Sequence, residues 1–148
     1  MYLSFFSRLR YPKSTHYIRS SLPKVISVPS IVRAMKKYGQ LDKEAFRLAL
    51  AWGNSPTIEI VAGLDACASF TPTPGNNTIQ IRQSIFDDFE AGRGWLLARA
   101  GWVAALGVNI LHETGHWGDT LDGVDWDEGD GEEGEAFEMD VYGRNLSC

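Results

Sequence analysis

The sequence predicts one α+β domain in which a small twisted sheet packs against a long central helix. The chain has 148 residues, enough to bury a core within one domain. Residues 57–64 and 78–86 alternate between apolar and polar side chains and are rich in β-branched residues, as half-buried strands are. Residues 95–116 instead place apolar side chains at three- and four-residue steps, which is typical of a helix.

The first third of the chain divides into an arm and two short helices. Residues 1–29 show no clear period and contain three prolines, so we expect an irregular N-terminal arm ahead of a domain spanning residues 30–148. Ser30 is a good N-cap for a helix over residues 31–38, and glycine follows it. Residues 41–52 repeat this pattern and predict a second helix.

The middle of the chain predicts the sheet and the central helix. We expect the strands at 57–64 and 78–86 to be antiparallel neighbours. The segment TIQIR at 78–82 should form the edge strand. Residues 87–94 are polar and indicate a connection, after which the helical period of residues 95–116 begins.

An acidic run and a short helix complete the predicted elements. The run DGVDWDEGDGEEGE at residues 122–135 favours a solvated loop over a calcium site, because Asp130 stands where an EF-hand loop needs glycine. The segment EAFEMDVYG then predicts a last helix that ends at Gly143.

Composition excludes several classes of protein. A net charge of -5 argues against a nucleic-acid-binding surface, which needs clustered lysine and arginine. No apolar window is long enough for a membrane span, and the charges follow the apolar opening MYLSFF, which is the wrong order for a secretory signal. We interpret Cys67 as a small buried apolar residue and Cys148 as a terminal thiol. A disulfide between them would indicate an oxidising compartment.

The stretch HETGH at the end of the predicted central helix contains the candidate metal-binding and catalytic residues. His112 and His116 are four residues apart and therefore lie on one helix face, where two imidazoles can converge on one cation. Glu113 lies about 100° round the helix, near enough to accept a proton from a water that zinc activates. This H-E-x-x-H pattern is that of zinc-dependent amide hydrolysis.

Zinc needs a third protein ligand, and the spacing leaves two routes open. A glutamate on the following helix could supply it, either Glu135 or Glu138. Alternatively, Asp122 could reach back through a short turn, as in the extended motif that ends H-x-x-G-x-x-H. Here the glycine of that motif is displaced by one residue, to Gly118.

Two separated segments, HETGHWGDTLDG and GEEGEAFEMDVYG, resemble the zincin-like metallopeptidase toxin domains of bacterial polymorphic toxin systems, in particular the metallopeptidase toxin 3 group. The resemblance covers mainly the C-terminal part of the chain. The residues that carry it are His112, Glu113, His116, Gly118, Asp119, Asp122, Gly123, Glu132, Glu133, Gly134, Phe137, Glu138, Tyr142 and Gly143.

The resemblance implies roles for individual residues within a zincin-like fold. It favours Glu138 over Glu135 as the third zinc ligand, with Glu113 as the catalytic acid and base. Asp119 and Glu133 would be acids that orient the histidines or the helix start. Tyr142 could donate to the oxyanion, although a core position is the commoner role for a tyrosine.

The resemblance also implies an activity and a setting. We expect one zinc ion per chain and hydrolysis of a protein or peptide substrate that pairs with the edge strand. The domain would be secreted or delivered into a target cell, with a cognate immunity protein. Two alternatives remain open at this point. One is a zinc hydrolase of a non-peptide amide, such as a cell-wall amidase. The other is a structural metal-binding module in which Asp122 closes the site.

Overall fold

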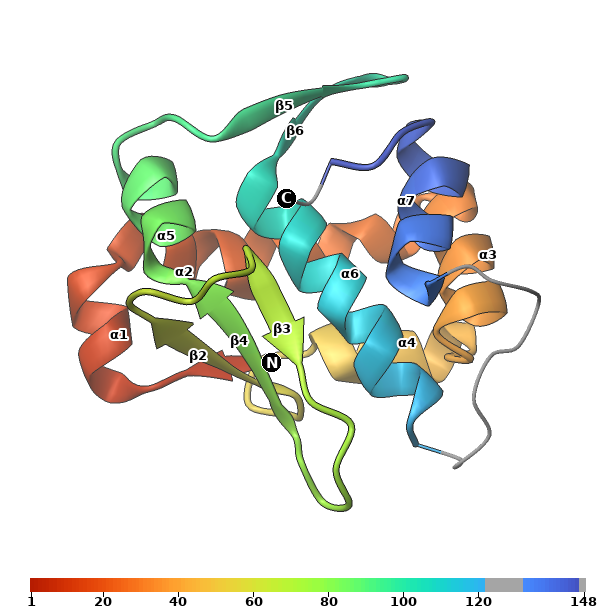
Figure 1. Ribbon diagram of the computed structural model, residues 1–148, viewed down its shortest axis with the longest axis horizontal. Helices are drawn as coiled ribbons and strands as arrows, with labels where there is room; N and C mark the ends of the chain where they lie inside the picture. Colours follow the sequence, from red (N-terminus) through yellow and green to blue (C-terminus); the bar gives the residue numbers. More distant parts are fainter. Residues whose placement is uncertain (122–131, 147–148) are drawn as a thin grey trace.

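The computed structural model describes residues 1–121 and 132–146 and shows a mixed α and β fold, with a small sheet and several helices (Figure 1). Helix α6 (Ala105–Asp119) crosses the centre of the molecule between the sheet and helix α7 (Glu133–Tyr142). Its residues are almost all buried. The aromatic side chains of Phe46, Phe86 and Phe137 are fully buried in the surrounding core.

The sheet has four strands, and its order differs from the one predicted. The strands are β1 (Tyr2–Leu3), β2 (Thr57–Val61), β4 (Thr78–Arg82) and β3 (Ala68–Phe70), in that order across the sheet. The two predicted strands, β2 and β4, are neighbours but run parallel, which corrects the antiparallel prediction. Parallel strands need a long crossover connection, and here it contains the strand β3 that periodicity missed.

The predicted edge strand is therefore wrong. Strand β4 is an inner strand, because β2 pairs with one side of it and β3 pairs antiparallel with the other. The edges of this sheet are β1 and β3. Strand β3 packs against α6, so the edge that is available near the histidines is β3 and not residues 78–82.

Residues 1–29 are not an irregular arm. They form β1, α1 (Phe5–Arg10), α2 (Pro12–His16), a short π-helix η1 (Tyr17–Ser21) and a 3-10 helix η2 (Leu22–Ser27). The three prolines occupy the first turns of helices, where the backbone N–H that proline lacks would have no partner within the helix. They therefore begin helices, whereas we expected them to indicate irregular structure. Met1 and Leu3 are fully buried in the common core.

Three predicted helices are confirmed. Helices α3 (Pro29–Tyr38) and α4 (Lys43–Leu50) lie where the apolar stripes placed them, and Asp42 caps α4 by accepting a hydrogen bond from the Ala45 backbone N–H at 2.8 Å. Helix α7 ends at Gly143, whose φ of 79° lies in the left-handed region that favours glycine.

The predicted central helix is too long at its N-terminal end. Residues 95–104 form a hairpin of β5 (Trp95–Ala98) and β6 (Gly101–Ala104). Before it, helix α5 (Gln83–Glu90) replaces the end of the strand predicted over residues 78–86 and the first half of the connection predicted over residues 87–94. Both hairpin strands are apolar on both faces, so they lack the alternation that identifies a surface strand. Gly101 has a φ of 127°, which a helix cannot accommodate.

Three further expectations concern the cysteines, the acidic run and membrane spans. Cys67 is buried and disulfide-bonded, so its interpretation as a free buried residue is wrong. Cys148 and residues 122–131 of the acidic run lie outside the described residues. Within the ranges that the structure describes, no helix has the length and apolar character needed to cross a membrane.

Two glycines of α6 should respond oppositely to substitution by alanine. A Cβ at Gly118 would lie 2.3 Å from the Gly39 carbonyl oxygen and 2.6 Å from Leu41 Cγ, whereas a Cβ at Gly115 would meet nothing within 4 Å. We expect Gly118→Ala to lower the free energy of unfolding by about 1–3 kcal/mol through overpacking. Gly115→Ala should raise it by roughly 0.5–1 kcal/mol, because alanine loses less backbone entropy in a helix.

Urea unfolding of both variants followed by circular dichroism measures the difference. Equal destabilisation of the two would show that the contact between the residue 39–41 turn and α6 is not a tight one.

Candidate metal centre

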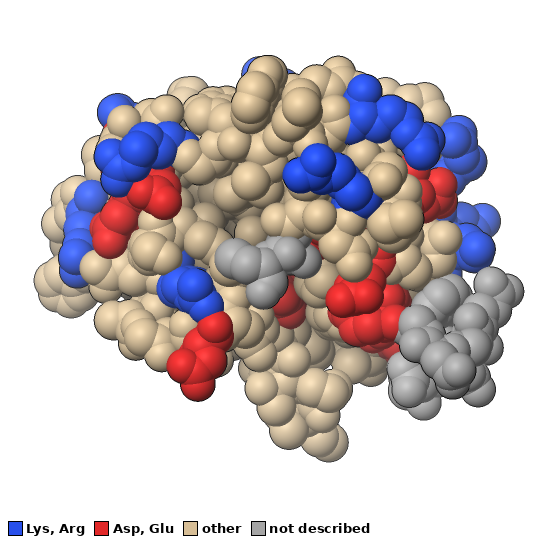
Figure 2. Space-filling view, turned by 45° about the horizontal axis from the view of Figure 1, so that its top comes forward, with Lys and Arg blue, Asp and Glu red and all other residues tan. Residues whose placement is uncertain are grey.

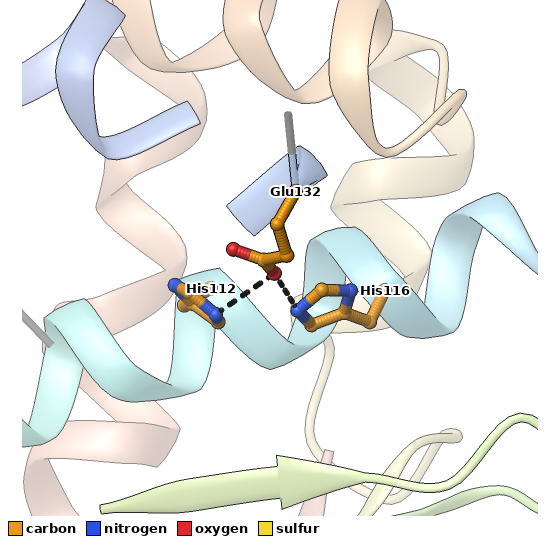
Figure 3. Close-up of side chains that lie close together, drawn as sticks. All are labelled: His112, His116 and Glu132. Carbon is orange, nitrogen blue, oxygen red and sulfur yellow. Dashed lines mark ion pairs between the residues drawn. The ribbon is translucent and has the colours of Figure 1, made fainter. Parts of the chain in front are cut away.

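Helix α6 presents His112 and His116 on one face, one turn apart. Their ring centroids are 5.0 Å apart, and both rings are largely buried. The Nε2 atoms of both rings point at one oxygen, Oε1 of Glu132, which lies 3.3 Å from Nε2 of His112 and forms an ion pair with Nε2 of His116 (Figure 3). Three side chains from two segments therefore converge on one point.

Glu132 is held in place by the start of α7. It is the N-cap residue of that helix, and its carboxylate accepts hydrogen bonds from the backbone N–H groups of Gly134 at 3.2 Å and Glu135 at 2.7 Å. Burial raises the pKa of Glu132, but hydrogen bonds from the two histidines outweigh burial and hold it well below its usual range. Glu132 is therefore ionised at neutral pH.

Each histidine has a second carboxylate on its other ring nitrogen. Glu138 Oε1 lies 2.8 Å from Nδ1 of His112, and Glu133 Oε1 lies 2.9 Å from Nδ1 of His116. Glu138 is fully buried, and its other oxygen accepts a hydrogen bond from the Leu146 backbone N–H. A carboxylate on Nδ1 fixes the ring orientation and leaves Nε2 as the ligand atom, which is the usual arrangement around metal-binding histidines.

These residues fit a metal ion. One ligand atom from each of His112, His116 and Glu132 lies within 4.8 Å of the others, and no other such group occurs in residues 1–121 and 132–146. Two imidazole nitrogens and one carboxylate oxygen are the donors that catalytic zinc sites use. The orientation of both rings and the chemistry of the three donors therefore agree with metal binding.

The close approach of α7 to α6 depends on a missing side chain. A Cβ on Gly134 would lie 2.4 Å from Nε2 of His112 and within 2.6 Å of two further ring atoms, so the ring packs flat against this glycine. Any other residue at this position would push the histidine away from Glu132.

Glu113 faces a cleft beside the histidine pair. Its side chain is 4% exposed, and burial raises its pKa against the opposing effect of the two histidines. The backbone of Phe70 on β3 also opposes this rise in the pKa of Glu113. The carboxylate thus lies between the metal-binding group and the edge strand.

The cleft has a volume of about 1150 Å³ and two chemically different walls. Helix α6 and the start of α7 form one wall, whose charged side chains apart from the histidines are the acids Glu113, Asp119 and Glu133. Strand β3 and residues 72–77 form the other wall, which has no charged residue. The indole N–H of Trp117 donates to Asn77 Oδ1 at 3.0 Å and so ties residues 72–77 to α6.

The residues predicted as third ligand or as supporting site residues lie in different surroundings in the structure. Glu138 meets Nδ1 of His112, on the side of the ring away from Glu132, and Glu135 is exposed on α7. Asp119 is buried and accepts a hydrogen bond from Gln40 at 2.5 Å. Tyr142 packs edge-on against Phe137 and does not line the cleft. Asp122 lies outside the described residues.

Glu132 is a candidate ligand that sequence reasoning did not assign. Arguments from helix spacing favour residues within a helix, whereas Glu132 acts from the position just before one. The sequence feature that could have identified Glu132 is the triplet Glu132-Glu133-Gly134. Two adjacent acids can each meet a different histidine, and the glycine after them permits the contact between helices.

Comparisons with known proteins give one match. The family model described as metallopeptidase toxin 3 matches residues 7–143. No curated protein and no solved structure matches the chain.

The carboxylates around His112 should make it an unusually strong base once metal is removed with a chelator. Burial lowers the pKa of His112, but hydrogen bonds with Glu132 and Glu138 outweigh it and raise the pKa to about 10. Because this value exceeds that of the unfolded chain, the charged ring should stabilise the fold fully below about pH 6.5, and this contribution should disappear as pH rises through about 10.

NMR titration of the imidazole carbon-bound protons in chelator-treated protein measures this pKa. Glu138→Gln should lower it, since the variant replaces a charged acceptor by a neutral one. A His112 titration near its ordinary value of 6.5 would contradict the arrangement of carboxylates described above.

Proposed function

The chain belongs to the metallopeptidase toxin 3 family, and we propose that it is a zinc-dependent peptidase of zincin-like architecture. The observation that carries this proposal is the pairing of each histidine with two carboxylates. Each Nε2 faces the shared oxygen of Glu132, and each Nδ1 meets a carboxylate of its own. Isolated surface histidines have no reason to be oriented in this way.

We assign His112, His116 and Glu132 as the zinc ligands. This assignment replaces the expectation that Glu138 is the third ligand. Both oxygens of Glu138 are engaged, one by Nδ1 of His112 and one by the Leu146 backbone N–H, so its role is to orient the ring. Glu133 does the same for His116.

Glu113 is the proposed proton carrier. Zinc, when bound, supplies the Lewis acidity that makes water a nucleophile and a carbonyl an electrophile near neutral pH. The Glu113 carboxylate takes the proton that the attacking water loses and delivers it to the nitrogen of the leaving amine. Burial, which raises the pKa of Glu113, suits a group that must hold that proton between the two steps.

The cleft supports an extended peptide as substrate. Its volume of about 1150 Å³ exceeds the usual range for small-molecule sites, about 300–1000 Å³, and it runs along β3. Strand β3 is an edge strand, to which an extended chain can add as a further strand. The opening of the cleft at Glu113 favours a catalytic centre over a closed structural metal site.

The biological role we propose follows from the family. The domain would be a toxin or effector that is delivered into a target cell, cleaves a protein there and is neutralised in the producing cell by an immunity protein. A cell-wall amidase would use the same residues, but the open edge of β3 favours a peptide.

The ligand assignment can be tested by metal content. Glu132→Ala should remove most of the zinc, since two imidazoles alone make a poor site, whereas Glu138→Ala should weaken zinc binding by about 10–100-fold. Glu135→Ala is the matched control, because Glu135 is also a glutamate, lies on α7 three residues before Glu138 and is exposed. Zinc is quantified by mass spectrometry of purified protein and by competition with a chromogenic chelator. Retention of zinc by Glu132→Ala together with its loss from Glu138→Ala would return the third ligand to Glu138.

The proposed role of Glu113 can be tested separately from metal binding. Glu113→Gln should keep zinc and the fold but lower the rate of casein or peptide cleavage by about 100-fold or more, because it removes only the proton carrier. Chelation of zinc should abolish cleavage by the unmodified protein, and added zinc should restore it. Full activity of Glu113→Gln would show that another group carries the proton.

A further inference from the structure

The β5–β6 hairpin exposes a face of large apolar side chains. Trp95 and Leu97 are each 51% exposed and Trp102 is 67% exposed. Leu97 lies directly opposite Trp102 in the strand register, and Trp95 precedes Leu97 by two residues, so all three share one face. On the opposite face, Leu96 and Val103 pack against the core. An antiparallel ribbon at the surface normally has a polar outer face, and this one does not.

The exposure is not due to a loosely held segment. The Ala105 backbone N–H donates to the Gly94 carbonyl at 2.8 Å at the base of the hairpin, and the Arg99 N–H donates to the Tyr142 carbonyl at 3.0 Å near its turn. Figure 1 shows the hairpin lying along the top of the molecule, on the side away from the β3–β4 connection that walls the cleft. The hairpin is therefore a fixed apolar face that does not obstruct the cleft.

The outer face continues into a second, smaller hollow. This groove of about 520 Å³ is lined by an aromatic row in which Phe89 lies between Trp95 and Tyr17, with ring centroids 6.4 and 4.9 Å apart. Lys13 and His16 also line the groove. The apolar surface thus borders the basic N-terminal helices.

The sequence segments that form this surface and border its groove are rich in basic residues, although the whole chain is acidic. Residues 91–112 contain two arginines and no acid, and residues 1–41 contain eight lysines and arginines and no acid, although the chain has a net charge of -5. Neighbouring α5 has three acids, and all are engaged. Asp87 accepts a hydrogen bond from the Tyr11 hydroxyl, Asp88 pairs with Arg93, and Glu90 accepts hydrogen bonds from the Lys13 and Ser14 backbones. Figure 2 shows basic side chains on both sides of the uncharged region at the top of the molecule.

We propose that this face binds the surface of an anionic phospholipid membrane. Tryptophan is the side chain most typical of the interface between headgroups and acyl chains, and a rigid apolar face with cationic neighbours is the usual form of a peripheral membrane anchor. Trp95, Leu97 and Trp102 enter the interface, and Arg99 at the turn contacts lipid phosphate. The surrounding lysines and arginines select anionic lipid. This proposal does not depend on the peptidase activity.

Partition of the purified full chain onto vesicles tests the proposal. Protein should co-sediment with vesicles of phosphatidylcholine and phosphatidylglycerol but bind pure phosphatidylcholine weakly, and added salt should reduce binding. Leu97→Glu and Trp102→Glu should each lower the partition coefficient by about tenfold or more. Leu48→Glu is the matched control, since Leu48 is 44% exposed on α4 and lies outside the hairpin, and it should bind as the unmodified chain does.

A second measurement on the unmodified chain covers the case in which a variant fails to fold. Brominated phosphatidylglycerol should quench tryptophan fluorescence, because two of the five tryptophans would lie in the interface. Absence of binding to anionic vesicles, or unaltered binding by folded Leu97→Glu, overturns the proposal. A dimer in sedimentation that Leu97→Glu dissociates, without vesicle binding, would assign the face to a second copy of the chain and overturn it as well.

Discussion

The contact between helix α6 and the start of helix α7 is the constraint on which the rest of the site depends. Helix α6 supplies the two histidines, and α7 with its N-cap supplies the three carboxylates that contact their ring nitrogens. Burying so many charged groups together costs free energy that their mutual attraction recovers only when every partner is in place. Removing one carboxylate would leave an uncompensated charge, so the geometry of the group is strongly determined. Gly134 permits the contact because it adds no side chain between His112 and the helix start.

Sequence periodicity predicted those elements whose surroundings repeat along the chain. Helices α3, α4 and α7 each bury one stripe, and strand β4 buries alternate residues, so their patterns are visible without the fold. Periodicity does not reveal the relative direction of two strands, because that direction depends on how the chain between them crosses the sheet. The hairpin was misassigned to the central helix for a physical reason. Its residues are apolar on both faces, and a strand of that kind cannot be distinguished from a buried helix by period alone.

The candidate site was predictable where its chemistry is local. His112, Glu113 and His116 occupy a single helical turn, and their spacing alone places both rings on one face. The carboxylates were harder, because four glutamates at 132, 133, 135 and 138 lie within one short segment and their roles depend on how α7 crosses α6. In the structure, adjacent glutamates meet different histidines, and the most deeply buried one contacts the far side of a ring. Spacing cannot distinguish these positions, whereas the helix crossing does.

The hydrogen bond from Leu146 to Glu138 bears on when the site can form during synthesis. Residues from Met1 to Asp119 contain the whole sheet, and ribosomes release them before α7 and the segment after it. The nascent chain can therefore assemble its sheet around α6 while both histidines still lack every carboxylate partner supplied by residues 132–138. Glu138 reaches its final hydrogen bonding only after Leu146 has emerged. The order of translation thus delays the complete histidine and carboxylate group until nearly all of the described chain has been made.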